Sequence, residues 1–426
     1  MKKLLSLFII VAILFSMSGC SASAVKDGLA SGGSGDVLDS FSDMITNGGD
    51  FKVDADAEGS EMMDSMSPAE GEAVDGGTSQ NVVVAGTLTA GEWKDSENIE
   101  FWTKLLNRND WYQYMELRNL FPTKIVTVNV RDKKDNPCYN VEVALIGGDG
   151  QTAYAARTDI NGNAYLLYDI NNSKEIVSHV RVGEQTLKVT DDNVVNVVAE
   201  DAGVGIKALD LMLMVDTTGS MGDELEYIQK ELEDVIKRVA EADESLSINV
   251  SVNFYRDDTD EYVVRSFEFT DNIEKILKQL KKQETDGGGD YPEAVHTALN
   301  NVVNEHQWRE DAVKLCFFIL DAPPHKEAEI NGIDSQLQSY VRKAAAEGIR
   351  IIPVASSGVD TETEFLMRSY ALMTGGTYVF LTNHSGIGGD HLEPTIGEYE
   401  VEALNELMIR VVSEYCGLKY TRPSAQ

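Results

Sequence analysis

Residues 211–220, LMLMVDTTGS, form an unbroken apolar run that ends in a carboxylate and three hydroxyls. The apolar run does not alternate with polar residues, so it predicts a strand buried on both faces. A charged stretch that favours helix follows, from about residue 223 to residue 242. Asp216, Thr218 and Ser220 therefore lie where a central strand ends and a helix begins. In an open α/β sheet, ligands bind at this edge.

These three residues have two interpretations when taken alone. Their oxygens are hard donors, and the i, i+2, i+4 spacing in a tight loop can aim them at one point, which suits Mg²⁺, Mn²⁺ or Ca²⁺. In the simpler interpretation, Asp216 and Ser220 only cap the helix that follows.

Two downstream motifs favour the metal. Residues 286–293, DGGGDYPE, separate two helix-like stretches, and three glycines let the backbone approach a ligand closely. Pro292 suits the first turn of the second helix. Residues 313–320 form a second apolar strand, which ends in the sequence DAPPH at 321–325. Two predicted strands thus end in an aspartate, with a glycine-rich acidic loop between them.

Together these motifs resemble the von Willebrand factor type A domain with its metal-ion-dependent adhesion site. That family has Asp-x-Ser/Thr-x-Ser after the first strand, a Thr or acidic residue in a second loop, and an Asp after a later strand. Asp216, Thr218, Ser220 and Asp321 match this pattern. The second and third motifs look most like bacterial and kinase-associated domains of this type, and they resemble the equivalent loops of integrin β subunits. The resemblance covers residues 208–417.

The second loop departs from the usual pattern. Thr285 is the candidate for the usual threonine, but the glycines separate it from the next helix. An acidic residue replaces it in the integrin β type, and Asp290 is preferred here over Glu293. The resemblance implies a divalent cation, Mg²⁺ first, with Mn²⁺ or Ca²⁺ as alternatives. The implied metal ligands are Asp216, Thr218, Ser220, Asp321 and Asp290, with Glu293 as the less certain candidate.

The rest of residues 208–417 predicts the fold. Strand-like and helix-like stretches alternate, which indicates a doubly wound, mostly parallel α/β sheet flanked by helices. The other expected strands are 247–255, 262–269, 349–355 and 377–381, and the other expected helices are 272–283, 292–305, 336–346, 362–373 and 401–418.

The N-terminus predicts export. Residues 1–19 combine two lysines, an apolar stretch and small residues, as a secretory signal peptide does. Residues 17–20, MSGC, resemble a bacterial lipobox, in which Cys20 becomes lipid-modified and begins the mature chain. The alternative is an ordinary cleaved signal with an incidental cysteine. A lipidated chain is expected to be extracytoplasmic and anchored to the cell membrane, at the cell surface.

The segments in between have contrasting compositions. Residues 20–91 are acidic and rich in glycine and serine, which predicts a disordered tether. Residues 92–122 predict an aromatic-rich helical segment whose rings pack against the next domain, with a membrane-interface or carbohydrate contact as the alternative. Regular turn signals in 123–200 predict a small β-sandwich, similar to Ig-like or carboxypeptidase-regulatory-like modules. The α/β domain is expected at 208–418 and a tail at 419–426. Residues 159–163, DINGN, predict a hairpin turn rather than a calcium loop.

The composition excludes some functions. The chain has 36 basic and 71 acidic residues, a net charge of −35, which disfavours nucleic-acid binding because phosphates need a basic surface. Beyond Cys20, three cysteines give no disulfide framework. Cys316 is expected in the core, and a bridge to Cys416 stays open.

The sequence therefore predicts a cell-surface binding module, not an enzyme. Its cation would bind an acidic residue of a protein partner, in adhesion or envelope assembly. One rival is a haloacid-dehalogenase-like phosphohydrolase, which normally needs a second acid two residues after its first aspartate, where Thr218 stands. Another is a structural lipoprotein whose metal stabilises the fold. His325 is expected to make a loop hydrogen bond or a partner contact, and His296 to be structural.

Overall fold

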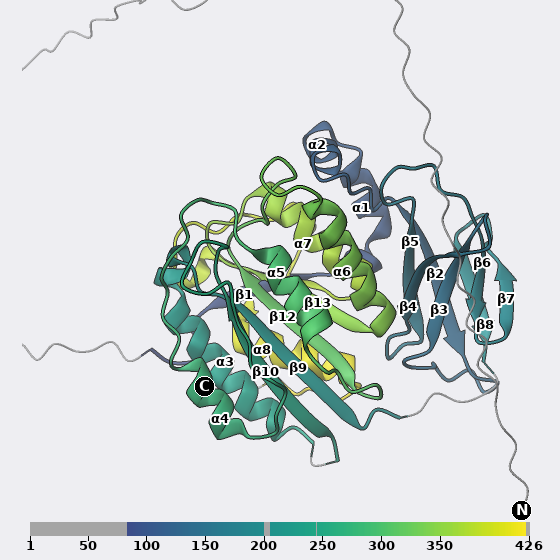
Figure 1. Cartoon of the computed structure of the whole chain (residues 1–426). Coiled ribbons are helices and arrows are strands. Elements are labelled where there is room, and N and C mark those ends of the chain that lie inside the picture. Colours follow the sequence, from purple (N-terminus) through teal and green to yellow (C-terminus); the bar gives the residue numbers. More distant parts are fainter. Residues whose placement is uncertain (1–82, 200–204, 244, 423–426) are drawn as a thin grey trace, which may run out of the picture. The chain divides into compact units, whose positions relative to one another are not determined.

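The computed structural model describes residues 83–199, 205–243 and 245–422. The predicted signal peptide, Cys20 and most of the predicted tether at 20–91 lie outside these residues. The described strands form one eight-stranded sheet and two smaller sheets (Figure 1).

The large sheet is mixed and mostly parallel. Its strands, in spatial order, are β11 (Val264–Arg265), β10 (Ser247–Tyr255), β9 (Ala208–Asp216), β12 (Val313–Leu320), β13 (Ile349–Ala355), β14 (Tyr378–Leu381), β1 (Thr89–Trp93) and β15 (Glu402–Ala403). The strands from β10 to β14 run parallel, and the strands beyond them at both edges pair antiparallel. This arrangement confirms the predicted α/β sheet.

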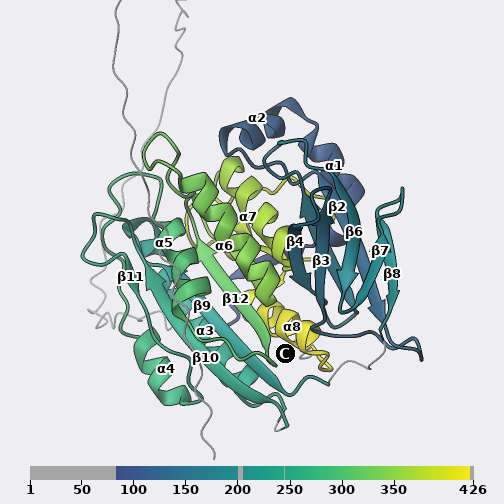
Figure 2. The ribbon, with the colours of Figure 1, turned by 45° about the vertical axis from the view of Figure 1, so that its right-hand side comes forward.

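Helices cover both faces of this sheet (Figures 1 and 2). One face carries α3 (Leu225–Ala240), α4 (Ile273–Leu280) and α8 (Leu404–Cys416), and the other carries α5 (Val295–Asn300), α6 (Ile333–Glu347) and α7 (Thr361–Thr374). Along β9, Leu211, Leu213 and Val215 face the first group, while Met212 and Met214 face the second. Because alternate side chains are buried on opposite faces, the strand is apolar throughout.

Strand β1 was not predicted. It lies where we expected the tether to give way to a helical segment, yet it pairs with β14 and β15 inside the large sheet. The buried carboxylate of Glu231 fixes its approach, since it accepts hydrogen bonds from the amides of Thr87 at 2.8 Å and Leu88 at 3.0 Å. At Gly91, a Cβ would lie 2.4 Å from the Phe380 ring, so the close pairing with β14 requires glycine.

The aromatic segment that follows packs against the large α/β unit. It forms η1 (Asp95–Glu97), α1 (Ile99–Leu106) and α2 (Asn109–Leu117). Trp102 and Trp111 are fully buried, and Trp111 contacts Phe365 of α7 edge-on, with ring centroids 6.2 Å apart. The rings were expected to pack against the next domain in sequence, but these contacts are with a helix much further along the chain.

Seven strands between residues 124 and 198 form the two smaller sheets. One has the order β5 (Asn163–Tyr168), β2 (Lys124–Arg131), β8 (Val194–Val198), and the other β4 (Thr152–Arg157), β3 (Glu142–Gly147), β6 (Val177–Val182), β7 (Gln185–Lys188). The Tyr154 hydroxyl donates to the Met373 carbonyl at 2.7 Å, which joins β4 to the end of α7. The resemblance to an Ig-like module stays a prediction.

Several element bounds differ from expectation. The strand expected at 262–269 is only the two residues of β11, and the helix expected at 292–305 begins at Val295 and continues as a π-helix, η3 (Asn301–Glu305). Pro292 therefore precedes the helix. Short 3₁₀ turns are η2 (Gly219–Asp223) and η4 (Asn383–Ser385).

The two cysteines considered as a pair are separate buried thiols. Cys316 packs on the α5–α7 face of the sheet and Cys416 on the α3–α8 face, and no disulfide joins them. Within the described ranges, none of the helices has the length and apolar character that a membrane crossing requires.

Candidate metal site at the carboxyl edge of the sheet

The first loop folds around the carboxylate of Asp216, the last residue of β9. Asp216 is fully buried, and its Oδ1 accepts hydrogen bonds from the Thr218 amide at 2.9 Å and the Thr218 hydroxyl at 2.7 Å. The Thr218 Oγ1 lies 3.2 Å from the Ser220 Oγ. Among the described residues, no side-chain hydrogen bond caps η2 or α3, so Asp216 and Ser220 do not cap the following helix.

The glycine-rich loop lies against this first loop. The Gly219 amide donates to the Gly287 carbonyl at 3.2 Å. Gly288 has φ +69°, and a Cβ there would lie 3.0 Å from the Glu293 Oε1 and 3.2 Å from the Thr218 Cβ. Glycine is therefore required for the close approach, which brings Glu293 beside Thr218.

Glu293 and Asp290 are placed differently. The Glu293 amide donates to the Pro323 carbonyl at 2.9 Å, and Glu293 is only 2% exposed. This backbone pairing joins the second loop to the loop after β12. Asp290 is exposed, and it takes no part in the contacts that join the other five candidates in the described structure. The fold thus gathers Glu293, not the preferred Asp290, with the first loop.

Asp321 comes from the neighbouring strand. Strand β12 runs parallel to β9, with Ile319 opposite Val215, so Asp321 follows its strand at the same sheet edge as Asp216. Asp321 is 2% exposed. Burial and the Asp216 charge raise the pKa of Asp321, and the nearby Ser220 hydroxyl acts against this rise.

Three carboxylates at this edge each carry an unpaired oxygen. Among the described residues, the buried atoms Asp216 Oδ2, Glu293 Oε2 and Asp321 Oδ1 have no well-aligned hydrogen-bond partner, although the buried Tyr255 hydroxyl lies near Asp216. A buried polar atom without a partner costs about 1–3 kcal/mol, and the charges of Asp216 and Asp321 both act on Glu293, so the three carboxylates lie near one another. The donor set is three carboxylates and two hydroxyls, which are the hard oxygens that Mg²⁺, Mn²⁺ and Ca²⁺ prefer. The residues fit a divalent cation.

The pKa values of these three carboxyl groups are all raised, as expected for buried acids that have no positive charge beside them within the described ranges. Burial raises the pKa of Asp216 to about 6, against the hydrogen bonds from Thr218. Burial and the charge of Asp216 raise the pKa of Asp321 to about 8. The same two causes, with further nearby carboxylates, raise the pKa of Glu293 to about 9. Without a cation, the three carboxylates hold protons more tightly than usual, because protonation reduces their mutual repulsion.

Sequence reasoning missed the residue that holds the third loop in place. Arg118, at the end of α2, is 1% exposed and donates to the backbone carbonyls of Pro324 at 2.7 Å and His325 at 2.6 Å. Its guanidinium also pairs with Glu362 at 2.6 Å. The aromatic segment thereby fixes the loop that carries Asp321. Only the position of a lone arginine after an aromatic helix could have suggested this role.

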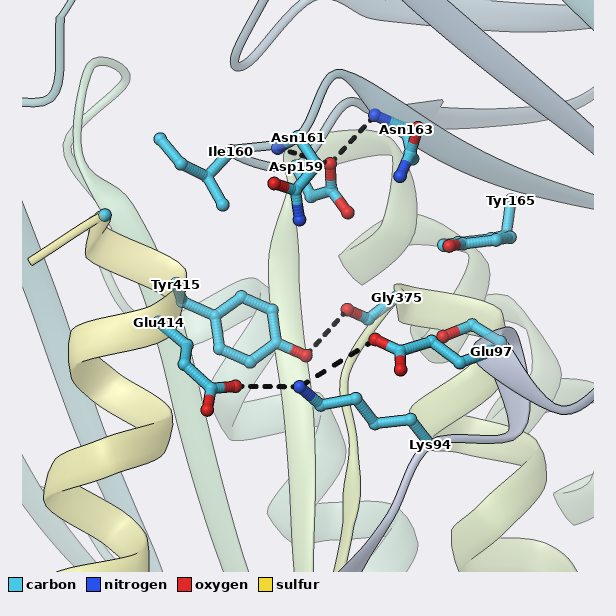
Figure 3. Close-up of a pocket in the computed structure, with 12 residues that line it drawn as sticks. Lys94, Glu97, Asp159, Ile160, Asn161, Asn163, Tyr165, Gly375, Glu414 and Tyr415 are labelled. Atoms are coloured by element: carbon cyan, nitrogen blue, oxygen red, sulfur yellow. Dashed lines mark hydrogen bonds and ion pairs between the residues drawn. The ribbon is translucent and has the colours of Figure 1, made fainter. Parts of the chain in front are cut away.

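The DINGN turn lies at the opposite edge of the sheet, beside a cavity of about 440 Å³ (Figure 3). The Asp159 Oδ1 accepts from the amides of Asn161 at 2.9 Å and Asn163 at 2.8 Å, so this carboxylate closes its own turn. The turn joins β4 to β5, which belong to different sheets, so it is not the expected hairpin. Across the cavity, Lys94 pairs with Glu414 at 2.8 Å.

Comparisons with known proteins assign the central region. Residues 210–352 match the family profile of the von Willebrand factor A domain. This match contains all six predicted metal-site residues but only about a third of the chain.

Two individual proteins show weaker similarity. A putative ariadne-like RING finger protein of Acanthamoeba polyphaga mimivirus is 27% identical over 190 residues, which is 41% of this chain and 18% of that protein. The match thus spans less than a fifth of the relative's length. The crystal structure of the conserved hypothetical protein BatB from Bacteroides thetaiotaomicron is similar over 49% of this chain and 99% of that chain, with 14% identity and a TM-score of 0.32. That score is too low to add to the assignment. The family match and the observed sheet identify residues 210–352 as part of a von Willebrand factor A-type domain.

Proposed function

We propose that this protein binds a divalent cation at the carboxyl edge of its large sheet and uses it to hold an acidic residue of a protein partner. A von Willebrand factor A-type domain indicates a role in adhesion or protein interaction. The observation that carries the finer proposal is the set of three buried, unpaired carboxylate oxygens on Asp216, Glu293 and Asp321.

In this proposal, the three carboxylates supply charge and the hydroxyls of Thr218 and Ser220 supply neutral ligands. Such a cation, most simply Mg²⁺, would offer a coordination position to a partner's carboxylate. Because three carboxylates exceed the charge of a dication by one, we expect the metal to bind more tightly than the partner.

The neighbouring residues keep this ligand set in place. Thr218 fixes the orientation of Asp216 through two hydrogen bonds. Ser220 is exposed while the carboxylates are buried, so the serine lies on the side from which a partner can approach. Arg118 holds the backbone that follows Asp321.

The rival functions have less support. A haloacid-dehalogenase-like phosphohydrolase normally uses a second acid at the position of Thr218, whose hydroxyl instead donates to Asp216. We therefore expect no hydrolysis of a generic aryl phosphate in the presence of Mg²⁺. A purely structural metal would raise the melting temperature without changing any partner's affinity.

We further propose that lipidation of Cys20 anchors the protein to the outer face of a cell membrane. A Cys20→Ala variant should then appear in the soluble fraction after cell lysis, while the unchanged protein stays with the membranes. Equal partition of the two proteins would contradict the anchor.

The carboxylate-binding proposal is tested with paired peptides. An array of peptides with a central Asp or Glu, each matched by its Asn or Gln counterpart, is probed with the protein in Mg²⁺ and in EDTA. We expect some acidic peptides to bind only in Mg²⁺, and their amide counterparts and an Asp216→Asn variant not to bind. Equal binding of acidic and amide peptides, or binding unaffected by EDTA, would contradict the proposal.

A further inference from the structure

A second group of metal-ligating side chains lies at the same sheet edge, outside the site described above. Asp257 and Asp258 follow β10, and His325 follows β12. One ligand atom from each lies within 4.8 Å of the others. The closest pair is His325 Nε2 and Asp257 Oδ1, at 2.7 Å. Asp257 and Asp258 lie between the strands expected at 247–255 and 262–269.

The imidazole of His325 is fixed on its other side. Its Nδ1 lies 3.1 Å from the Glu329 Oε2, and the same carboxylate oxygen accepts from the Lys326 amide at 2.9 Å. A carboxylate that accepts the Nδ1 proton leaves Nε2 as the nitrogen for a metal, which would replace the proton that Nε2 shares with Asp257. Carboxylates orient metal-ligating histidines in this way in many proteins. Since Arg118 also holds the His325 carbonyl, both the backbone and the ring are held in place.

A second histidine approaches from a different element. His296 lies on α5, and its Nε2 is 3.9 Å from the Asp258 Oδ2. Its Nδ1 is buried and has no hydrogen-bond partner among the described residues. The nitrogen that faces Asp258 is Nε2, which also lies 3.2 Å from the Thr297 Oγ1. His296 thus lies beside the group, while the ligand atoms of Asp257, Asp258 and His325 are the ones that lie within 4.8 Å of one another.

We propose that Asp257, Asp258 and His325 form a site for a first-row transition metal dication such as Zn²⁺, distinct from the Asp216 site and with His296 at its edge. Imidazole with carboxylate is a donor set typical of zinc, whereas Mg²⁺ and Ca²⁺ prefer oxygen alone. The Asp258 side chain is 38% exposed, so a metal can enter from solvent, while the Asp257 side chain is 4% exposed.

The two sites share an electrostatic neighbour. Glu293 lies within the influence of the charges of Asp216 in the first site and Asp257 in the second. A cation in either site would make the electrostatic potential at Glu293 less negative. We therefore expect a metal bound at one site to weaken metal binding at the other site moderately at low salt.

The test is a calorimetric titration of Zn²⁺ into the full chain carrying Asp216→Asn and Asp321→Asn, which disable the first site. We expect one saturable site to remain in this background. Adding His325→Gln or Asp257→Asn should abolish it, and adding Glu329→Gln should weaken it about 10–100-fold. The matched control is His179→Gln, because His179 is an exposed histidine of β6.

The failures of the two proposals are distinguishable. In the otherwise unchanged protein, His325→Gln should leave Mg²⁺ binding in place, since Mg²⁺ reports on the first site. Asp258→Asn provides a second test if the His325 variant loses its native melting transition, because Asp258 is partly exposed. No Zn²⁺ binding in the Asp216→Asn, Asp321→Asn background would overturn the second site. So would Zn²⁺ binding that both Asp257→Asn and Asp258→Asn leave unchanged.

Discussion

Strand β9 buries an aspartate near each of its ends, and the two have different partners. At the start of the strand, Asp210 accepts from the Arg309 amide and Nε, both at 2.7 Å, through its two oxygens. At the end, Asp216 is equally buried, but within the described structure its Oδ2 has no donor. Arg309 thus supplies a positive charge to Asp210, whereas no described side chain supplies one to Asp216.

The same difference recurs between the two other regions that bury carboxylates. Beside the aromatic segment, the fully buried Arg368 pairs with Asp95 at 2.6 Å and with Glu364 at 2.9 Å. At the carboxyl edge, Glu293 and Asp321 are buried, and no arginine within the described ranges pairs with them. Asp95 and Glu364 thus have an arginine to balance their charge, whereas among the described residues Asp216, Glu293 and Asp321 have none, which supports a cation from outside.

The largest expected effect comes from breaking a pair. We predict that Arg368→Met destabilises the protein by about 3–5 kcal/mol, because it leaves Asp95 and Glu364 buried and uncompensated. Denaturant unfolding measures this change. The control adds Asp95→Asn and Glu364→Gln to the same variant, which should recover most of the loss. A loss below about 1 kcal/mol would place this pair with weak surface ion pairs.

At Asp216, which has no arginine partner among the described residues, removing the negative charge should stabilise the metal-free protein. We predict that Asp216→Asn stabilises the metal-free protein by about 1–3 kcal/mol at pH 7, since a buried charge no longer needs a partner. The same variant should lose the stabilisation that Mg²⁺ gives the unchanged protein. Melting curves in EDTA and in Mg²⁺ measure both effects. Destabilisation in EDTA would indicate that Asp216 already has an adequate partner.

The stability of the metal-free protein should also depend on pH. The folded-state pKa values of Asp216, Asp321 and Glu293, about 6, 8 and 9, lie above their ordinary values. The folded state therefore holds protons that the unfolded state has lost, so stability falls as pH rises from about 4 towards 9. With saturating Mg²⁺ the carboxylates stay ionised and this decline should disappear. Parallel declines with and without Mg²⁺ would contradict the account.

The smallest expected effect is on Mg²⁺ affinity and concerns two acidic residues of the glycine-rich loop. We predict that Glu293→Gln weakens Mg²⁺ binding about tenfold or more, a loss of about 1.4 kcal/mol, whereas Asp290→Asn changes it less than about twofold. The reason is that Glu293 is buried beside Thr218 while Asp290 is exposed. Calorimetric titration of the two variants decides between them. The opposite order would restore Asp290 as the ligand.

The parts of the fold with strong local signals were predictable. Strands β9 and β12 are apolar on both faces and end in aspartate, so their existence and common edge followed from sequence alone. Strand β1 was not predictable, because its first three residues continue the predicted tether and its last two begin the predicted aromatic helical segment. Its strand conformation depends on pairing with β14 and β15 and on the Glu231 carboxylate, all distant in sequence.

Some residues of the candidate metal site could also be predicted from the sequence, and others could not. Asp216, Thr218 and Ser220 lie in one short loop, so their spacing already indicated a common target. The choice between Asp290 and Glu293 depends on the path of the glycine loop, which is set by the backbone pairing of Glu293 with Pro323. Asp257 and His325 are 68 residues apart in sequence, and no local pattern predicts that they meet.

The most direct test of the central claim is a calorimetric titration of Mg²⁺ into the purified metal-free protein, repeated with Asp216→Asn. The account predicts saturable binding at a single Mg²⁺ site that the variant lacks. The absence of Mg²⁺ binding, or equal binding by the variant, would contradict the claim that these unpaired carboxylates hold a divalent cation.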